Sequence, residues 1–270
     1  MSKQRVAIIF GGVSSEHEVS LMSATSIINN IPEDKYEIVC LGITKKGRWL
    51  YYPGDVSLLV SGKWENHPDC VPAFICPDAN VHGIVKLLPD GSASTLKIDV
   101  AFPVLHGKNG EDGTIQGLFA LAGIPFVGCD TASSAVCMDK VFTKTIMDQN
   151  GIPNAKWLYT TKNQMDEFDE FAKAVEEKLH YPVFVKPANA GSSVGVNKAT
   201  DKESLKSAVQ IALANDSKVL VEEAIVGKEI ECAVLGNENP EASLPGEDVY
   251  KRQLPLWQKK EKPRGDPRGF

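Results

Sequence analysis

The sequence predicts an α/β fold in which a parallel-sheet domain precedes a smaller α+β domain. Short apolar runs such as RVAIIF, typical of buried strands, alternate with segments whose apolar residues recur at near-helical spacing. Glycine and proline separate these segments, as expected where turns join strands to helices. The 270 residues are 43% hydrophobic and 24% charged, which suits a globular protein of one large domain or two to three small ones.

The first domain, residues 1–130, is expected to begin with a strand, a turn, a helix and a second strand. Residues 5–10 have a buried-strand pattern that a glycine pair interrupts. Residues 16–31 carry apolar side chains at near-helical spacing, and residues 36–43 return to a strand pattern. This order predicts a parallel sheet with helices on its faces.

The rest of this domain is less regular. Residues 47–97 hold several prolines and predict an insertion with short strands, not a separate domain. Residues 98–105 have another strand pattern, and residues 106–113 form a polar loop with three glycines. A helix over residues 115–122 is expected to end at Gly123.

Three further segments are expected beyond residue 130. They are a central subdomain at 131–222, the start of a C-terminal subdomain at 223–247, and a tail at 248–270 that is not native to the protein. The predicted elements are helices over 132–150 and 164–179, a helix from Asp201 with a capping box at Thr200 to Glu203, and strands over 157–161, 219–221 and 230–235.

Charge and hydropathy disfavour several classes of function. The net charge of −6 argues against nucleic acid as the main partner, because phosphate backbones require a basic face. No apolar run is long enough for a membrane helix, and the N-terminus does not resemble a secretory signal. The six scattered cysteines fit a reducing compartment. The sequence therefore predicts a cytoplasmic protein.

One group of potential metal ligands stands out in the irregular segment. His67, Cys70, Cys76 and His82 could supply four zinc ligands, but their spacings match no common zinc module. A proline-rich excursion between strands explains them better. We therefore assign no metal site to this chain.

The loop over residues 188–193, ANAGSS, carries the first chemical signal. It is longer than a strand reversal needs, since a two-residue turn suffices. Lys186 stands at its entrance, and neither a Walker loop nor a GxGxxG motif is present. A loop rich in backbone N–H groups and hydroxyls beside a lysine would form a flap over phosphates. A mobile surface hairpin explains the same residues equally well.

Two further groups favour a nucleotide site. Lys140 lies on a predicted helix with Lys144 one turn on, where both ammonium groups could reach phosphates or could face solvent. Glu222 and Glu223 end an apolar run, so in a strand their carboxylates point to opposite faces, and Glu229 follows the bend. Together with the flap, these residues describe a nucleotide between two sheets.

Five motifs in a fixed order identify a family resemblance: GGVSSEHEVS, LHGKNGEDGTIQG, MDKVFTK, VKPANAGSSVGV and EEAIVGKEIECAVLG. The set closely resembles the D-alanine–D-alanine ligase family of the ATP-grasp superfamily, from about residue 6 to residue 247. The resemblance implies a pre-ATP-grasp N-terminal domain followed by an ATP-grasp domain that is incomplete at the C-terminus.

The resemblance implies roles for the substrate residues. Glu16 corresponds to the catalytic and substrate-binding carboxylate near the ammonium of the first D-alanine, and His106 to a substrate-pocket histidine. Ser192 and Ser193 resemble the flap serines near phosphate and substrate, Ser192 being assigned a catalytic role. From the residues alone, Glu16 could be an acid at a helix N-terminus, which is a common arrangement. Without its flanking glycines, His106 would be interpreted as a loop histidine bonded to backbone.

The resemblance also implies the nucleotide contacts. Lys140 and Lys186 look like the two lysines that hold ATP phosphates, and Glu222 and Glu229 like contacts to adenine and ribose. The backbone of Glu223, Ala224 and Ile225 is expected to line the adenine slot.

The implied reaction joins two D-alanine molecules for peptidoglycan synthesis. One carboxylate attacks the terminal phosphate of ATP, and the amine of the second D-alanine attacks the acyl phosphate. In the family, Mg²⁺ or Mn²⁺ neutralises the phosphate oxygens, and its ligands lie after the position of residue 247. Residues 248–270 match none of that segment, so the chain alone is expected to be an inactive fragment of a protein that is a homodimer when intact.

Three other functions are compatible with part of this pattern. A ligase that joins D-alanine to D-lactate differs in the acceptor-side loop, which the matched residues do not include. A non-catalytic nucleotide-binding fragment fits every residue present. A dinucleotide oxidoreductase is disfavoured because no GxGxxG follows the first strand.

Overall fold

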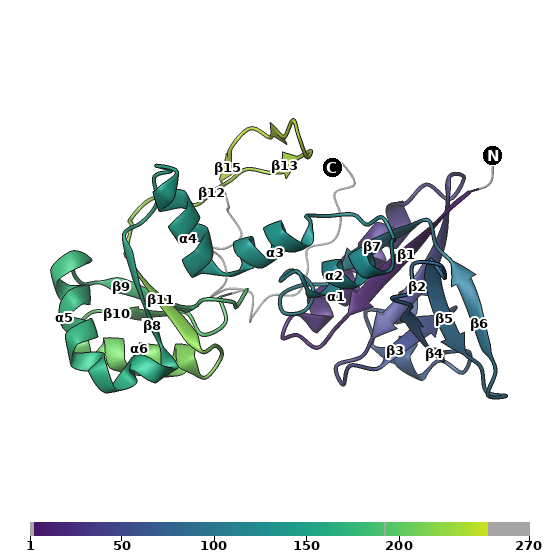
Figure 1. Cartoon of the computed structure of the whole chain (residues 1–270), viewed down its shortest axis with the longest axis horizontal. Helices are drawn as coiled ribbons and strands as arrows, with labels where there is room; N and C mark the ends of the chain where they lie inside the picture. The colour runs from purple at the N-terminus through teal and green to yellow at the C-terminus, as the bar shows by residue number, and fades with distance from the viewer. Residues whose placement is uncertain (1–2, 192, 248–270) are drawn as a thin grey trace, which may run out of the picture. The chain divides into compact units, whose positions relative to one another are not determined.

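The structure is a computed structural model that describes residues 3–191 and 193–247 (Figure 1). Its contacts divide the chain into two units, Met1–Ala224 and Ile225–Phe270. Among the described residues, no helix has both the length and the apolar character needed to cross a membrane.

The first sheet of unit Met1–Ala224 has seven strands in the order β6-β5-β4-β3-β2-β1-β7. Only β1 pairs in parallel, with β2 on one side and β7 on the other, and the remaining pairs are antiparallel. The strands are β1 (Gln4–Gly11), β2 (Tyr36–Ile43), β3 (Trp49–Tyr52), β4 (Val71–Ile75), β5 (Gly83–Leu87), β6 (Ala93–Lys97) and β7 (Val100–Val104).

The predicted parallel sheet is therefore a mixed sheet. The irregular segment 47–97 does form short strands, as expected, but these strands extend the sheet as successive antiparallel neighbours. Short connections permit only antiparallel pairing, because a parallel crossover needs a dozen or more residues. Two short 3-10 helices, Val56–Leu58 and Lys63–Asn66, lie in the same segment.

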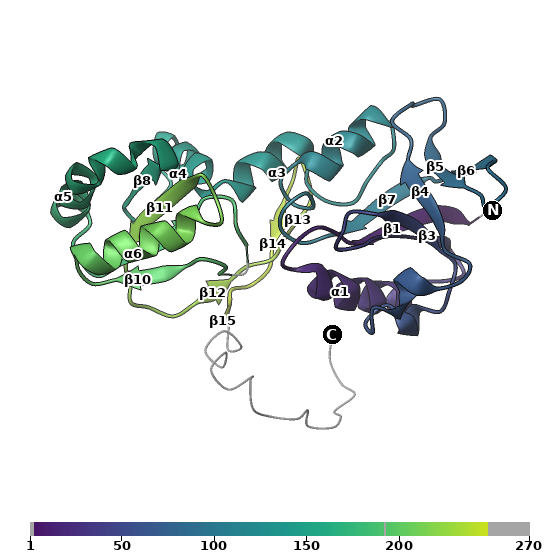
Figure 2. The same ribbon diagram turned by 90° about the horizontal axis from the view of Figure 1, so that it is seen from below.

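Strand β1 is buried on both faces, which explains its continuous apolar run. Ala7 and Ile9 join the core under α2 (Thr114–Leu121), whereas Ile8 and Phe10 join a second core under α1 (His17–Asn30). Figure 2 shows the two helices on opposite sides of the sheet. Covering helices on both faces are what parallel strands require.

Residues 132–150, predicted as one helix, form two. Helix α3 (Thr131–Met138) ends at Asp139, and α4 (Lys140–Gln149) begins directly after it. The Asp139 carboxylate accepts hydrogen bonds from the backbone N–H groups of Val141 and Phe142, so it serves as the N-cap of the second helix. The single-helix prediction was wrong because both halves have helical spacing.

The second sheet of this unit has four antiparallel strands in the order β10-β9-β11-β8. Two helices pack on one face, where a core of apolar side chains joins them to β9 and β11. The elements are β8 (Trp157–Thr161), β9 (Val183–Pro187), β10 (Asn197–Ala199), β11 (Lys218–Glu223), α5 (Phe168–Lys178) and α6 (Lys202–Leu213).

The starts of both covering helices differ from the prediction. The expected helix 164–179 opens as a 3-10 helix, Lys162–Glu167, before α5. The capping box of α6 is formed by Asp201 and Ser204, one position later than predicted. A carboxylate at the N-cap position serves as well as the predicted threonine.

The described part of unit Ile225–Phe270 consists of four two-residue strands. Strand β12 (Ile230–Glu231) pairs with β15 (Gly246–Glu247), and β13 (Val234–Leu235) pairs with β14 (Glu241–Ala242). The single strand expected over 230–235 is thus two separate strands. The proposed tail, 248–270, lies outside the described residues.

Candidate active site

Strand alternation sorts the side chains of β9 and β11 into two sets. Val185 and Val221 point into the core under α5 and α6. Because successive side chains of a strand point to opposite faces, Lys186 and Glu222 emerge on the other face. The two strands are hydrogen-bonded neighbours, with Leu220 opposite Lys186. The sequence therefore places a lysine and a glutamate side by side on the face that α5 and α6 leave free.

Helix α4 packs against this second face and adds its own lysines. Val141 forms a small core with Leu220 and Ala188. That contact directs the first turns of α4 toward the sheet, with Lys140 as its first residue and Lys144 one turn later.

Glu222 is the centre of a compact charged cluster. Lys186 Nζ forms an ion pair with Glu222 Oε1, and Lys144 Nζ lies 3.3 Å from Glu222 Oε2. The side chains of Lys144 and Glu222 are only 13% and 14% exposed. One carboxylate between two ammonium groups leaves an excess of positive charge, which suits an anionic ligand.

Lys140 joins the same region through the flap. Its ammonium donates to the carbonyl oxygen of Ala190 at 2.7 Å and lies 3.4 Å from that of Ala188. Burial and the neighbouring charge of Lys186 lower the pKa of Lys140 below its ordinary value, with nearby carboxylates only partly opposing them. Lys140 thus contacts the backbone of the loop after β9, for which the sequence allows either a phosphate flap or a surface hairpin.

Asp139 fixes the position of Lys140. Besides capping α4, its carboxylate lies 2.5 Å from Lys218 Nζ of β11, and the Asp139 side chain is only 7% exposed. Burial alone would raise the pKa of Asp139, but the hydrogen bond and charge of Lys218, with the N–H groups of the cap, hold it below its ordinary value. The pair joins the start of α4 to the sheet.

We expect Asp139→Ala to destabilise the protein by about 3–5 kcal/mol, because it removes a cap and leaves the Lys218 charge partly buried without its partner. Asp130→Ala, which removes only the exposed cap of α3, should cost about 1 kcal/mol. Urea unfolding at neutral pH measures both. Equal losses in the two variants would contradict the role given to the ion pair.

The same pair predicts an acid dependence. Because the folded-state pKa of Asp139 lies below its unfolded value, the unfolded state binds more protons, and the stabilisation is complete only above the ordinary aspartate range. It is lost as the pH falls through the lowered pKa. The difference in unfolding free energy between wild type and Asp139→Asn should therefore shrink below about pH 4.

The turn between β1 and α1 brings Glu16 to the flap. A side-chain carbon placed on Gly107 would lie 2.3 Å from Glu16 Oε2, and one placed on Gly191 would lie 3.0 Å from it. A cavity of about 190 Å³ opens here, lined by residues of the Val13–Glu16 turn, by Gly107 and by the flap residues Asn189 to Gly191. The two glycines therefore allow the backbone of both loops to approach the carboxylate.

His106 lies next to this turn but faces another cavity. Its Nε2 is 3.1 Å from Ser23 Oγ, and its Nδ1 is 3.5 Å from Glu111 Oε1. It lines a neighbouring cavity of about 330 Å³, together with Gly12 and Leu105, and the two cavities share Val13 and Lys108. The predicted substrate histidine is thus near Glu16 in the fold without lining the cavity at Glu16.

The remaining predicted residues fall into three groups. Ser193 is exposed and has a positive φ of 59°, and Ser192 lies outside the described residues. Glu223 accepts a hydrogen bond from Lys156 N at 2.7 Å, away from the lysine cluster. Ala224 ends the first unit, whereas Ile225 and Glu229 belong to the second.

The described residues contain no group of three or more His, Cys, Asp or Glu side chains placed to hold a metal ion. Two of the residues that were considered as zinc ligands, His67 and Cys70, contact other side chains and backbone instead. The His67 ring packs edge-on against Tyr52, and Cys70 Sγ donates to the carbonyl oxygen of Trp64.

Sequence reasoning left three residues of this region unassigned. Lys144 was considered as a phosphate ligand, but the sequence of its helix does not show whether this lysine faces the protein or the solvent. Asp139 and Lys218 were missed because they lie 79 positions apart. The one local signal was an aspartate directly before a helical pattern, which is a typical N-cap.

Comparison with known proteins gives matches along most of the chain. Residues 5–129 match the family model "D-ala D-ala ligase N-terminus", and residues 146–266 match "D-ala D-ala ligase C-terminus". The second range includes most of the segment expected to lie outside the resemblance. A D-alanine–D-alanine ligase of Thermoanaerobacter sp. is 51% identical over 254 residues, which cover 94% of this chain and 70% of the relative.

Two solved structures extend the comparison. The VanG D-Ala:D-Ser ligase of Enterococcus faecalis has a TM-score of 0.83 at 40% identity, covering 91% of this chain and 70% of its own. The D-alanine–D-alanine ligase of Bacillus anthracis complexed with ATP has a TM-score of 0.58 at 32% identity. The match covers 85% of this chain and 62% of the Bacillus anthracis chain. By its motifs, fold and identity to these relatives, the chain belongs to the D-alanine–D-alanine ligase family.

Proposed function

We propose that this protein is an ATP-dependent D-alanine–D-alanine ligase and that the described residues bind ATP and the first D-alanine. The observation that carries the proposal is the meeting of three elements at the flap. Lys140 bonds to flap carbonyls, Lys186 enters the flap from β9, and Glu16 lies against Gly191. In this proposal, the nucleotide and the first D-alanine bind on either side of one loop of small residues.

The lysine cluster would hold the triphosphate. A triphosphate carries more negative charge than one carboxylate, so it competes with Glu222 for the ammonium group of Lys186. We propose that this exchange frees Glu222 to accept a hydrogen bond from the adenine amino group. Lys140 would turn from the Ala190 carbonyl to phosphate, while Asp139 and Lys218 keep the start of α4 in place.

Glu16 would orient the first D-alanine. Its carboxylate attracts the substrate ammonium, which leaves the substrate carboxylate directed toward the terminal phosphate under the flap. An oxygen of that carboxylate then attacks phosphorus, the bond to ADP breaks, and an acyl phosphate forms. The amine of the second D-alanine attacks the acyl carbon, phosphate leaves, and the amine loses a proton. Backbone N–H groups of the flap would stabilise the transferring oxygens and exclude water.

The proposal includes Mg²⁺ or Mn²⁺ by family resemblance, because phosphoryl transfer needs neutralisation of crowded oxygens. The described residues offer no three-ligand group that fits such an ion. We therefore assign no residue to it and derive no step through it.

The wider role follows from the product. D-alanyl-D-alanine is a dipeptide of peptidoglycan precursors, so we propose a cytoplasmic role in cell-wall synthesis and cell shape, with ATP and D-alanine as the small-molecule partners. We also propose a homodimer, by family resemblance. Sedimentation of the purified protein tests the latter.

One alternative concerns the second substrate. The VanG relative joins D-alanine to D-serine, and D-lactate is the other acceptor considered for this chain. The 51% identity to a D-alanine–D-alanine ligase, against 40% to VanG, favours D-alanine as the acceptor.

The test is phosphate release with ATP, Mg²⁺ and D-alanine, with chromatographic identification of the product. It should be run on this chain and on the longest form that its native reading frame encodes, with D-serine and D-lactate as competing acceptors. We expect D-alanine-dependent release and D-alanyl-D-alanine from the longest form. Release that does not depend on D-alanine, or none at all, would overturn the assignment.

A further inference from the structure

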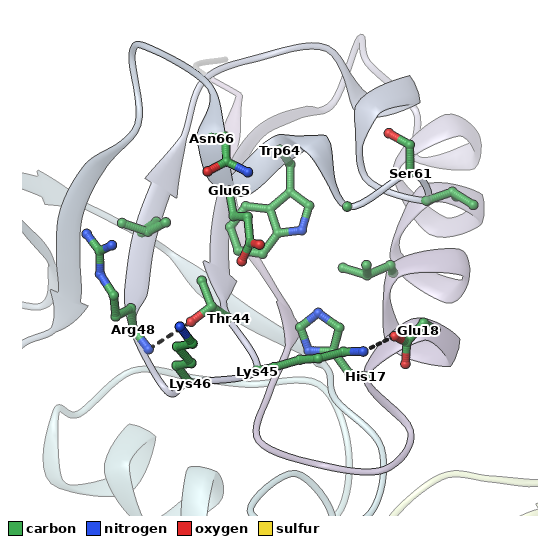
Figure 3. A pocket seen from close by; sticks show the side chains of 14 residues that line it. His17, Glu18, Thr44, Lys45, Lys46, Arg48, Ser61, Trp64, Glu65 and Asn66 are labelled. Atoms are coloured by element: carbon green, nitrogen blue, oxygen red, sulfur yellow. Dashed lines mark hydrogen bonds and ion pairs between the residues drawn. The ribbon is translucent and has the colours of Figure 1, made fainter.

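A cavity of about 690 Å³ beside α1 is lined by charged residues and by side chains of the buried core (Figure 3). Trp64 and Leu21, which belong to this lining, are only 1% and 3% exposed. They offer no face to a ligand, which would contact little more than the exposed side chains of Lys46 and Arg48. We therefore assign no ligand to this cavity.

The flap, residues 188–193, is held at its root by a carboxylate from another element. Asp216 lies in the turn between α6 and β11, 27 positions after Asn189. Its Oδ2 accepts a hydrogen bond from Asn189 N at 2.8 Å and another from Asn189 Nδ2 at 2.9 Å. One ionised oxygen therefore fixes both the backbone and the side chain of a flap residue.

The turn that carries Asp216 is fixed independently of the flap. Asn215 N and Asp216 N each donate to Ala212 O, at 3.0 and 3.1 Å, which ties the turn to the end of α6. Ser217 O accepts a further hydrogen bond from Lys162 N at 2.9 Å. The carboxylate is thus a fixed point, and the flap is the part that it holds.

The chain that leaves the flap returns to the same turn. Gly195 has a φ of +72°, and a side-chain carbon there would lie 3.0 Å from Asn215 Nδ2 and 2.9 Å from Pro187 Cγ. Glycine allows both the close approach and the left-handed backbone. Since Pro187 is the last residue of β9, both ends of the loop meet beside the turn between α6 and β11.

Lys140 also holds the root of the flap. Its Nζ donates to Ala190 O at 2.7 Å and lies 3.4 Å from Ala188 O. In the proposed reaction Lys140 turns from Ala190 O to phosphate, so this carbonyl loses its donor when ATP binds. The two bonds from Asn189 to Asp216 do not depend on that exchange. They can therefore hold the root of the flap after Lys140 has moved.

We propose that Asp216 is a positioning residue of the ligase reaction. By holding Asn189, it keeps the backbone of Ala190 and Gly191 where their N–H groups reach the oxygens of the transferring phosphate. The inference rests on the proposed function and adds to it a residue that does not line the cavity at Glu16. Loss of the contact slows phosphoryl transfer more than it weakens ATP binding, because the lysines that hold the triphosphate remain.

Asp216 also acts on Lys140 through its charge. Burial and the charge of Lys186 lower the pKa of Lys140, and nearby carboxylates, Asp216 among them, oppose this lowering. Asp216→Asn separates the two effects, because its amide oxygen can still accept from Asn189 although the charge is gone. A positioning role therefore predicts that Asp216→Asn retains most of the activity that Asp216→Ala loses.

Steady-state kinetics of the longest native form test the proposal. Asp216→Ala should lower kcat about tenfold to a hundredfold, as expected for a misplaced transition-state contact, and should change the KM for ATP by less than about twofold. Asp216→Asn should stay within about threefold of the wild-type kcat. The matched control, Glu203→Ala, removes an exposed carboxylate from the first turn of α6 and should leave both constants unchanged.

Asn189→Ala tests the contact from the side of the flap. It removes the Nδ2 bond but keeps the backbone bond, so kcat should fall by about twofold to tenfold. Because both variants act through one contact, Asp216→Ala/Asn189→Ala should lose little more than Asp216→Ala alone. Losses that multiply in the double variant would contradict a shared contact.

Hydrogen exchange measured by mass spectrometry reports on the flap without any turnover. The Asn189 N–H should exchange at least about tenfold faster in Asp216→Ala than in the wild type, because its acceptor is gone. It should exchange at the wild-type rate in Glu203→Ala. Unchanged exchange in Asp216→Ala would overturn the proposal.

The kinetic results separate this inference from the proposed function. No D-alanine-dependent phosphate release from the wild type would end both. Normal release with an unchanged kcat in Asp216→Ala would end only the role of Asp216. Equal kcat losses in Asp216→Ala and Asp216→Asn would show that the charge of Asp216 matters and not its hydrogen bonds to Asn189, which also contradicts the proposal.

Discussion

Lys186→Ala is expected to reduce D-alanine-dependent phosphate release by about a hundredfold to a thousandfold, because it removes a charge that stabilises the transferring phosphate. ATP affinity should fall at least about tenfold, as a charge-assisted contact is lost. The fold should persist, since Lys144 still pairs with Glu222 at 3.3 Å. Initial rates with the longest native form, ATP binding and urea unfolding measure the three quantities.

Lys198→Ala is the matched control. Lys198 lies on β10, the neighbour of β9 in the same sheet, and is exposed. Its removal changes net charge equally but should leave turnover and ATP affinity unchanged. Equal losses in both variants would show that only the overall charge matters, and unchanged turnover in Lys186→Ala would contradict its contact with phosphate.

Gly11→Ala is expected to destabilise the protein by about 2–5 kcal/mol. Gly11 has a φ of +88°, and a side-chain carbon there would lie 2.1 Å from the backbone oxygen of Ile43. An alanine is strained in this left-handed backbone conformation, and its side-chain carbon would overlap Ile43 O unless the neighbouring backbone moves. Because the turn that carries Glu16 follows directly, the affinity for D-alanine should fall as well.

Gly91→Ala separates the two causes. Gly91 has a similar φ of +83°, but no atom lies within 4 Å of an added side-chain carbon. This variant should cost only the conformational strain, about 1–2 kcal/mol, and should leave D-alanine binding unchanged. Urea unfolding of both variants gives the comparison. A Gly11→Ala cost no larger than that of Gly91→Ala would contradict the close approach at Ile43.

Local patterns in the sequence predicted the elements that carry the site. The strand at the N-terminus and the strands around Lys186 and Glu222 have a period that matches their burial. The helix after the first strand was predicted from apolar spacing that does not mark its buried face, since Val19 and Met22 are 48% and 58% exposed. The sheet that holds the N-terminal strand is mixed, not parallel. Segment 47–97 adds strands to one edge of it, and these strands pair antiparallel because the connections between them are short. Short strands were expected in that segment, but neither their bounds nor their order in the sheet was predicted.

Contacts between residues that are far apart in the sequence could not be predicted from local sequence patterns. Helices α3 and α4 separate at Asp139, whose carboxylate is fixed by Lys218 on another element. The Lys144 side chain is only 13% exposed because α4 packs against β11, whereas its own helix shows only a lysine at regular spacing. The place of Glu16 against Gly191 likewise depends on two loops 175 positions apart, 191 minus 16.

A crystal structure with a non-hydrolysable ATP analogue tests the central claim most directly. We expect the triphosphate in contact with the ammonium groups of Lys140 and Lys186, beneath the loop of residues 188–193, with adenine at Glu222. A nucleotide bound elsewhere, with Lys140 still bonded to Ala190 O and Lys186 still paired with Glu222, would contradict it.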